Sequence, residues 1–446
     1  MLNVLGLVKR MCSAFDVKIK PLTPIWTGDA ERKSTELRET GIIGSLRWWY
    51  EALIRGLGGR ACDPASDNKC NLDQKKFKKA IREGKSIQNA LSELICPACQ
   101  LFGCTDWSRK FILHVDSLNK SFAPFIIARP SGSKKPYFLG YYDSSGKAYG
   151  RNGGLLGEYK LMFYSKEDKL ELIKLLLKIA AKWGWGAGVQ KGFGMVYIED
   201  EVNFSNAELP INRNFSQKED YRLPLPRIDQ FFFYRIPFKN EFILQIRKIV
   251  SSSVYKTMSD LKNNSPLNET FDSYTYIPTS PWVRCSIRTS FKNNSVLRHF
   301  LMGFVSDNNL NPIHLGCCSH SIVDDRNNKG KYYCTTCRNG GIDEHDILEK
   351  TGSKIFVSHI YNKNAFKTGK KPKWEMKIWG WIPDLPEKLG TKRDDVKNML
   401  QSNIKSEAFW KNTFGLTDNP VIIESIWEMW DINPHILLDS GSDFYE

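Results

Sequence analysis

The stretch that decides the fold is Trp183-Gly-Trp-Gly-Ala-Gly-Val-Gln-Lys-Gly-Phe-Gly194, in which five glycines stand among aromatic and apolar residues. Glycine has no Cβ atom, so it adopts positive φ angles and allows close backbone approach. A Walker A loop needs Gly-Lys-Ser/Thr, but Lys191 precedes Gly192, and a dinucleotide fingerprint would need glycine at position 191. The stretch is therefore either a loop whose amides contact a phosphodiester chain or a turn that joins two elements.

The residues on either side of this loop predict a strand, a helix and a second strand. Lys160 to Tyr164 has strand character, and Ser165 with Asp168 three residues later resembles a helix N-cap. A helix is then expected from Lys166 to about Lys182, and a strand from Met195 to Ile198. Many nucleic-acid-binding folds present loop backbone beside a sheet in this way.

Toward the N-terminus, a strand and an amphipathic helix are expected. Residues 15–20 alternate between apolar and polar types, which predicts a strand. From Ile42, apolar residues recur at three- and four-residue steps until Gly58-Gly59, which predicts a helix. Arg47 and Arg55 share the opposite face with Glu51, so Arg47 either pairs with Glu51 on a solvated face or contacts a ligand.

The rest of the chain divides at a polar segment, residues 201–227, which has the composition of a linker. The further expected elements, in chain order, are strands at 111–115 and 124–128, two elements at 230–238 and 241–250, an amphipathic helix at 295–305, strands at 355–361 and 374–381, and a helix at 393–404. Two lysine-rich segments stand out, an insertion at 62–93 and a connection at 362–373 with five lysines.

The charge of the chain favours an anionic partner. Lys and Arg outnumber Asp and Glu by 64 to 49, which gives a net charge of +15. Aromatic residues make up 12% and often stand beside lysine or glycine, a pattern that favours single-stranded nucleic acid. No apolar stretch reaches the roughly 20 residues of a membrane helix, so we expect a soluble, cytoplasmic protein.

The eleven cysteines, without a secretory signal, predict metal sites before disulfides. The clearer spacing predicts a structural zinc site whose ligands are Cys317, His320, Cys334 and Cys337, with Cys318 and His314 as alternatives. A second, weaker site comprises Cys62, Cys70, Cys96 and Cys99. Reduced cysteines in an insertion or in the core are the alternative interpretation of both groups.

The sequence contains no convincing catalytic motif. The seven histidines are scattered and follow no zinc-protease or triad-like local pattern. Asp29, in a loop after Trp26, is either a loop acid or a helix-capping residue. A binding protein is therefore expected rather than an enzyme.

Several ordered motifs resemble one known family. They are Pro21-Leu-Thr-Pro-Ile-Trp-Thr-Gly28, Gly41-Ile-Ile-Gly-Ser-Leu-Arg-Trp-Trp-Tyr50, Cys96-Pro-Ala-Cys-Gln-Leu-Phe-Gly-Cys104, the glycine-rich stretch, Gly352-Ser-Lys-Ile-Phe-Val-Ser-His-Ile-Tyr361 and Trp374-Glu-Met-Lys-Ile-Trp-Gly-Trp-Ile-Pro383. Together they resemble the RAMP proteins of prokaryotic CRISPR systems, and among these the first subunit of the Cmr (type III-B) effector complex.

This resemblance implies an α+β fold of two ferredoxin-like (RRM-like) RAMP domains with insertions. The expected N-terminal domain is residues 1–205, with a Cys-rich insertion at about 60–105. A linker at 206–228 and a C-terminal domain at 229–446 follow, the latter with a zinc-ribbon-like insertion at about 312–342.

The implied function is that of a non-catalytic subunit that binds guide or target RNA in antiviral defence, together with other Cmr subunits. The expected RNA contacts are Arg47, Trp48, Arg55, Trp185, Gly186, Gly188, Lys191, Gly192 and Phe193. The alternatives are a RAMP endoribonuclease that processes the guide precursor and a general single-strand binder outside CRISPR.

Overall fold

A computed structural model of the chain describes residues 13–31, 33–67, 69–133, 136–141, 152–165, 169–200, 202–203, 209, 224–303, 313–314, 322–324, 332–334, 347–348, 352–416, 425–439 and 442–445. The N-terminal half, up to residue 203, contains β1 (Ser13–Pro21), α2 (Glu39–Gly56), α3 (Gln74–Arg82), α4 (Ile87–Leu94), α5 (Pro97–Phe102), β2 (Phe111–Pro124), β3 (Ile126–Ala128), β4 (Tyr137–Leu139), β5 (Asn152–Ser165), α6 (Leu170–Trp183), η1 (Val189–Lys191) and β6 (Val196–Ile198).

The C-terminal half, from residue 224, begins with η2 (Ile228–Gln230), β7 (Phe231–Phe238), α7 (Asn240–Ser251), β8 (Val254–Tyr255), α8 (Met258–Lys262), β9 (Tyr276–Ile277), α9 (Ser280–Ser290) and α10 (Ser295–Met302). It continues with β10 (Ile313–His314), β11 (Ile322–Asp324), β12 (Tyr332–Cys334), β13 (Ile347–Leu348), β14 (Ile355–Val357), β15 (Ile360–Asn362), β16 (Trp374–Trp381), η4 (Glu387–Leu389), α11 (Arg393–Lys405), α12 (Glu407–Phe414), β17 (Trp427–Trp430), η5 (Pro434–Leu438) and η6 (Asp443–Tyr445).

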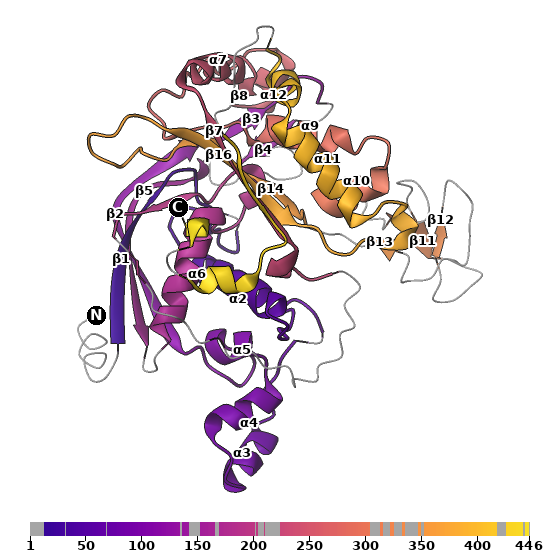
Figure 1. Ribbon diagram of the computed structural model, residues 1–446. Coiled ribbons are helices and arrows are strands. Elements are labelled where there is room, and N and C mark those ends of the chain that lie inside the picture. Colours follow the sequence, from indigo (N-terminus) through magenta and orange to yellow (C-terminus); the bar gives the residue numbers. More distant parts are fainter. Residues whose placement is uncertain are drawn as a thin grey trace.

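The N-terminal half is built on an antiparallel sheet with the strand order β2-β5-β1-β6. Along β1 the side chains of Val17 and Ile19 are buried while Asp16 and Lys18 are exposed, which confirms the predicted alternation. Helices α2 and α6 pack against each other and cover one face of this sheet (Figure 1). Counted along the chain, the elements are β-α-β-β-α-β, and the sheet order is fourth, first, third, second strand.

The C-terminal half repeats this strand order in a larger antiparallel sheet. Its order is β17-β7-β16-β15-β9, and β14 also pairs with β16. All eight residues of β16 are buried, because β7 and the β14–β15 segment flank it and helices of the same half pack over the sheet. The predicted strand at 374–381 has the observed bounds.

A third antiparallel sheet ties the halves together. Its order is β4-β3-β8, in which Ile127 of the N-terminal half pairs with Tyr255 of the C-terminal half. The expected α+β class is therefore confirmed, with three antiparallel sheets of three or more strands. No helix in the described ranges is long and apolar enough to cross a membrane.

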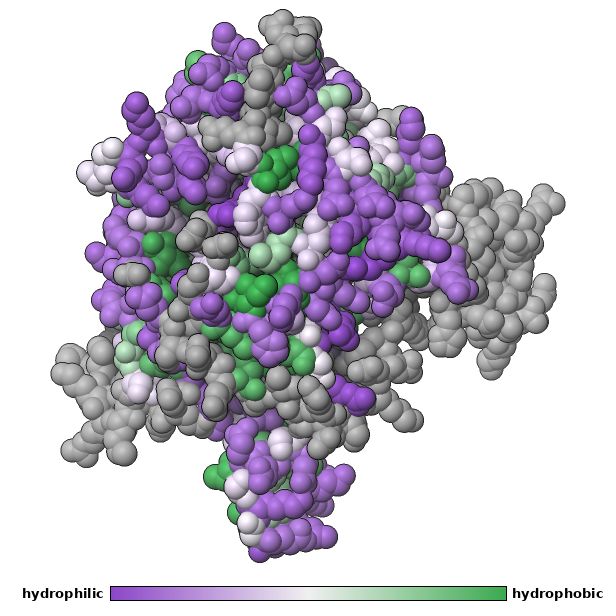
Figure 2. All heavy atoms as spheres, viewed as in Figure 1, coloured by the Kyte–Doolittle hydropathy of each residue, from purple (hydrophilic) through white to green (hydrophobic). Residues whose placement is uncertain are grey.

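The lysine-rich insertion forms a helical arm. Helices α3 and α4 pack on each other and project from the body (Figure 1). Asp73 and Ser86 are the N-cap residues of the two helices, and their side-chain oxygens accept hydrogen bonds from the first backbone amides. The arm is largely hydrophilic on the face shown in Figure 2, although the side chains of Ile81 and Ile87 are exposed.

Candidate metal centre and nucleic-acid interface

Four buried cysteines lie together at the base of the arm. The Sγ atoms of Cys62, Cys70, Cys96 and Cys99, here called the cysteine quartet, all lie within 4.8 Å of one another. Cys62 and Cys70 come from the segment between α2 and α3, whereas Cys96 and Cys99 begin α5. The quartet is the site that the sequence predicts less strongly.

The spacing of the sulfurs fits a tetrahedral metal ion. Zinc–sulfur bonds of about 2.3 Å place the corners of a ZnS₄ tetrahedron about 3.8 Å apart. The Cys62–Cys99 and Cys62–Cys96 sulfur distances are 3.4 and 3.7 Å, which are too long for a disulfide of about 2.05 Å. Four thiolates with no other ligand form a closed site, so a zinc ion here would stabilise the fold and leave no position open for a substrate.

Arg47 of α2 points at the quartet. One guanidinium nitrogen lies 3.2 Å from the Cys99 sulfur and 3.9 Å from the Cys62 sulfur, and another donates to the Gly103 carbonyl at 2.9 Å. Glu51 accepts from Arg47 at 2.8 Å, so the Arg47–Glu51 ion pair, one of the two alternatives for Arg47, is present. A zinc ion with four thiolates carries two negative charges, and Arg47 is placed to offset one of them.

Arg55 closes the same side of the site. Its buried guanidinium donates to the carbonyls of Ala61, Cys62 and Pro226 at 3.0 to 3.2 Å. The two arginines predicted to contact RNA are therefore directed into the protein, where they fix the ligand-bearing segment to α2. The periodicity that placed both on one helix face was correct, but it could not show that the insertion covers that face.

The sequence-predicted zinc ligands of the C-terminal half lie outside the described residues, except that Cys334 ends β12. That site stays a prediction. Cys104, the fifth cysteine of the first group, is half-exposed beside the quartet and donates to the carbonyl of Thr105.

The glycine-rich stretch, here called the glycine loop (Trp183–Gly194), lies between the halves. Its amides are used inside the protein, because Gly186 donates to the Ser45 hydroxyl at 2.8 Å and Ala187 donates to the Trp26 carbonyl at 2.7 Å. Gly194 donates to the Pro24 carbonyl at 2.9 Å. The loop joins helix to strand as predicted, but these amides do not form an open cradle for phosphate.

The aromatic residues of the glycine loop are core residues. Trp185 and Phe193 are each 1% exposed, so their rings offer no face for base stacking in this conformation. Trp48, another predicted RNA contact, packs edge-on against rings of both halves, which are Trp49, Phe231, Phe356, Trp379 and Trp381. In this conformation Trp185 and Phe193 are core residues, and Trp48 is partly buried between the halves.

Three loop positions show why glycine is needed there. Gly188 has a φ of +82° and a Cβ atom would lie 2.9 Å from the Phe193 ring. Gly192 has a φ of +98° and a Cβ atom would lie 2.6 Å from the ring of His359 in the C-terminal half. At Gly186 a Cβ atom would lie 2.7 Å from the Trp26 carbonyl oxygen. The glycines do allow close approach, as inferred from the sequence, and the groups that approach them here are other residues of the protein.

Lys191 is also engaged within the protein. Its ammonium group donates to the Gly140 carbonyl at 2.5 Å and lies 4.4 Å from the centre of the Tyr141 ring. Burial lowers the pKa of Lys191 to about 8. These contacts engage the ammonium group that the sequence analysis assigned to RNA.

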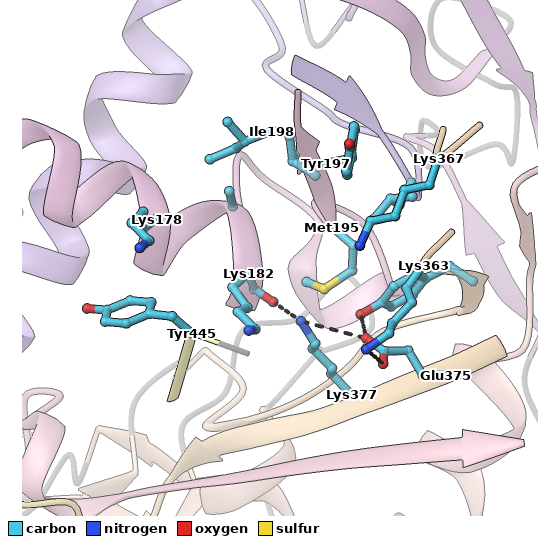
Figure 3. A pocket seen from close by; sticks show the side chains of 14 residues that line it. Lys178, Lys182, Met195, Tyr197, Ile198, Lys363, Lys367, Glu375, Lys377 and Tyr445 are labelled. Carbon is cyan, nitrogen blue, oxygen red and sulfur yellow. Dashed lines mark hydrogen bonds and ion pairs between the residues drawn. The ribbon is translucent and has the colours of Figure 1, made fainter. Parts of the chain in front are cut away.

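A pocket that the sequence does not predict opens between the halves. It has a volume of about 230 Å³ and is here called the lysine pocket (Figure 3). The lining residues come from α6, β6, β15, β16, η6, the residues next to β1 and β6, and the connection between β15 and β16. The charged ones are Lys178, Lys182, Lys363, Lys367, Glu375 and Lys377. Two features of the sequence could have pointed to this pocket. They are Lys377, a lysine inside a largely apolar strand, and the lysine-rich connection at 362–373.

The charges in the lysine pocket are only partly balanced. Glu375 is the one carboxylate of its lining; it accepts from the Tyr361 hydroxyl and lies 3.8 Å from the ammonium of Lys363 and 4.0 Å from that of Lys377. Lys377 donates to the Lys182 carbonyl at 2.7 Å, which caps the end of α6. Burial, followed by the charge of Lys377, lowers the pKa of Lys182 to about 6.

The N-terminal half of the chain matches a known protein family. The RAMP superfamily profile matches residues 18–197, which run from β1 to β6. These residues belong to the RAMP superfamily. The matched RAMP segment contains the cysteine quartet and the glycine loop, and its end lies at the lysine pocket.

Solved structures similar to this chain include Cmr1 from Pyrococcus furiosus in its apo form, with 11% identity and a TM-score of 0.32, covering 87% of this chain and 96% of that one. A chain of a type III-B Cmr-beta complex bound to cognate target RNA and AMPPnP has 13% identity and a TM-score of 0.39, covering 87% of this chain and 98% of that one. At these TM-scores the likeness carries no argument about function. No curated protein matches the sequence.

Proposed function

We propose that this RAMP protein is a non-catalytic RNA-binding subunit of a type III-B CRISPR effector complex, in which it contacts guide or target RNA beside other Cmr subunits. The RAMP match and the ordered motifs from Pro21 to Pro383 support this assignment. The strand order repeated in both halves supports two ferredoxin-like RAMP units. Neither half would then act alone, because they share a sheet and a junction.

The observation that carries the proposal is the lysine pocket at the junction of the two halves. Five of its lining residues are lysines and one is a carboxylate, in a chain whose net charge is +15. Positive charge without a compensating partner favours polyanions, and single-stranded RNA is the polyanion that RAMP proteins handle. The chemistry supported by this surface is binding through phosphates rather than readout of base edges.

The salt dependence of RNA binding tests the proposal. With a fluorescent, unstructured RNA, we expect the logarithm of the affinity to fall linearly with the logarithm of salt concentration, because bound lysines displace condensed counterions. Unrelated sequences should differ by less than about a hundredfold, since phosphates carry no sequence information. A flat salt plot, or no RNA binding by the purified chain, would contradict the proposal.

Two assays separate the proposal from its alternatives. Specific cleavage of CRISPR repeat RNA would favour the endoribonuclease, whereas we expect the RNA to remain intact. Co-expression with neighbouring Cmr subunits should yield a complex that withstands gel filtration. A chain that binds any single strand but never co-purifies with those subunits would be a general single-strand binder.

A further inference from the structure

We propose that the lysine pocket is a phosphate-binding site that takes one phosphate group of a single-stranded RNA, with Lys182 as its main anchor. This inference rests on the proposed RNA-binding function and names the place and the chemical group of one contact. It differs from the contacts predicted at the glycine loop, which the fold uses internally.

Lys182 is the pocket lysine whose charge the protein leaves unbalanced. Among the described residues its ammonium group has no hydrogen-bond or ion-pair partner, whereas Lys363 and Lys377 lie within 4.0 Å of Glu375. In Figure 3 the Lys182 side chain extends into the pocket from the end of α6, opposite Lys363 and Lys367. Among these cations the free protein holds the Lys182 amine largely unprotonated at pH 7, and a bound anion would favour its protonated, charged form.

The second observation is the balance of charge around this lysine. Lys178 and Lys367 add positive charge at the rim, and Arg235 lowers the pKa of Lys182 further after the larger effects of burial and Lys377. Glu375 does not cancel this charge, because Tyr361, Lys363 and Lys377 already surround its carboxylate. The excess of positive charge in the pocket therefore favours binding of an anion and disfavours binding of a metal cation.

The size of the pocket selects a phosphate group rather than a whole nucleotide. Its volume of about 230 Å³ is below the roughly 300–1,000 Å³ of pockets that enclose complete small-molecule ligands. Lysine is a point-charge binder of phosphate, and several lysines can share its oxygens. Tyr197 and Tyr445 also line the pocket, and tyrosine rings are surfaces on which bases stack.

The phosphate can belong to the inside of an RNA strand or to one of its ends. An internal phosphodiester carries one negative charge, and a terminal phosphate carries about 1.5 to 2 at neutral pH. Both share the chemistry that Lys182 recognises. The experiment therefore uses one 12-nucleotide sequence with hydroxyl ends, with a 5′-phosphate and with a 3′-phosphate.

The test compares two lysine-to-glutamine substitutions in the full-length chain. Lys182→Gln alters the pocket, whereas Lys262→Gln alters an exposed lysine of α8 outside its lining. We expect Lys182→Gln to weaken RNA binding at least tenfold at 100 mM salt and Lys262→Gln to weaken it less than twofold. Lys367→Gln, at an exposed pocket residue, should weaken binding in the same direction without disturbing the fold.

The melting temperature distinguishes a binding role from a structural one. Without RNA, Lys182→Gln should melt at the same temperature as the parent or higher, because the substitution removes a partly buried amine that has no hydrogen-bond partner among the described residues. A binding loss that accompanies a lower melting temperature in both Lys182→Gln and Lys367→Gln would overturn the proposal.

The three RNAs identify the source of the phosphate. If the pocket takes a terminal phosphate, the phosphorylated RNA binds more tightly than the hydroxyl-ended one, and Lys182→Gln abolishes that difference. If it takes an internal phosphate, the three RNAs bind alike and Lys182→Gln weakens all of them equally. If Lys182→Gln binds all three like Lys262→Gln, the pocket is not a phosphate site.

Inorganic phosphate separates failure of this inference from failure of the proposed function. We expect the ³¹P NMR signal of inorganic phosphate to broaden or shift when the parent chain is added. The change should be smaller when Lys182→Gln is added. A parent chain that shows this effect but binds none of the RNAs would overturn the RNA-binding function and leave the phosphate site standing. If the parent chain binds RNA but the phosphate signal is the same with the parent and with Lys182→Gln, the phosphate site is overturned and the RNA-binding function stands.

Discussion

The glycine loop and the lysine pocket adjoin each other in the chain, since Trp183 begins the loop and Lys182 lines the pocket, but they differ in what surrounds their side chains. Around the loop, the aromatic rings are buried and His359 donates its amide hydrogen to the Gly192 carbonyl at 3.2 Å. In the pocket, lysines outnumber carboxylates and Lys182 has no partner in the described part of the chain. Glycines and aromatic rings thus mark where the halves pack, and unbalanced charge marks where a ligand fits.

The largest effect is expected at the cysteine quartet. Like the glycine loop, the quartet packs against α2, through Arg47 and Arg55. Cys96→Ser should remove one zinc ion per chain and lower the free energy of unfolding by about 4 kcal/mol or more, because a structural metal contributes directly to folding. Elemental analysis and urea unfolding measure the two quantities. At temperatures where the variant stays folded, the lysine pocket should still bind RNA.

Cys285→Ser is the matched control, since Cys285 is a free cysteine of α9 remote from the quartet in sequence. It should leave the zinc content and the stability unchanged. If Cys96→Ser retains the zinc content of the parent, the quartet holds no zinc, and the site predicted at Cys317, His320, Cys334 and Cys337 becomes the candidate.

Gly192→Ala tests directly whether the glycine loop is packed. The new methyl group would meet the His359 ring and the Ser280 side chain at 2.6 to 2.7 Å, in addition to the cost of a positive φ. We expect a loss of about 3 kcal/mol in unfolding free energy, the sum of backbone strain and overpacking.

Gly369→Ala isolates the backbone contribution. Gly369 has a φ of +71°, but a Cβ atom there would have nothing within 4 Å, so the expected cost is about 1 kcal/mol. Equal costs at the two positions, or a Gly192→Ala variant that keeps its stability and loses RNA affinity, would make the loop an RNA contact after all.

The pH dependence of stability sharpens the comparison further. His359 is fully buried beside Phe193, Tyr276 and Ser280, and burial lowers its pKa from 6.5 to about 3. Below pH 6.5 the unfolded chain takes up a proton that the folded protein resists. The stabilisation is thus complete above pH 6.5 and declines as the pH falls, by about 2 kcal/mol at pH 5.

Urea unfolding at pH 7 and pH 5 measures this decline. In His359→Asn the side-chain oxygen can still accept the amide hydrogen of Ser280, but the position no longer titrates. The difference between the two pH values should therefore be about 2 kcal/mol smaller in the variant. An identical pH dependence in both proteins would mean that His359 is protonated in the folded state.

The smallest effect is expected from Lys191→Ala. The substitution removes a hydrogen bond to Gly140 and a cation–π contact with Tyr141, together about 1 kcal/mol of stability. RNA affinity should change less than twofold, because the ammonium group is already engaged. A salt plot that flattens by about one phosphate contact, with unchanged stability, would restore Lys191 to the RNA interface.

The sequence predicts the local elements well because their signals are local. The strand–helix–loop–strand order around the glycine loop and the bounds of β16 follow from periodicity and glycine spacing. The use of the loop could not be predicted in this way, because His359 and Ser280 come from another half of the chain.

The candidate sites show the same limit. Cys62 and Cys99 are 37 residues apart and have no zinc-finger spacing as a pair, so only the fold brings their sulfurs within 3.4 Å. Lys182 and Lys377 are 195 residues apart, and their contact depends on α6 ending against β16. A count of charges predicted an anionic partner, but it could not locate the pocket.

The β3–β8 pairing has a consequence for synthesis of the protein on the ribosome. The cysteine quartet lies within residues 62–99, so it can assemble while most of the chain is still to be made. Strand β3 pairs with β4 within the N-terminal half, but its second edge gains a partner only after Tyr255 has been translated. The glycine loop gains its contact with His359 later still. Until then a nascent N-terminal half exposes an unpaired strand edge and apolar rings, the features that chaperones bind and that cause aggregation.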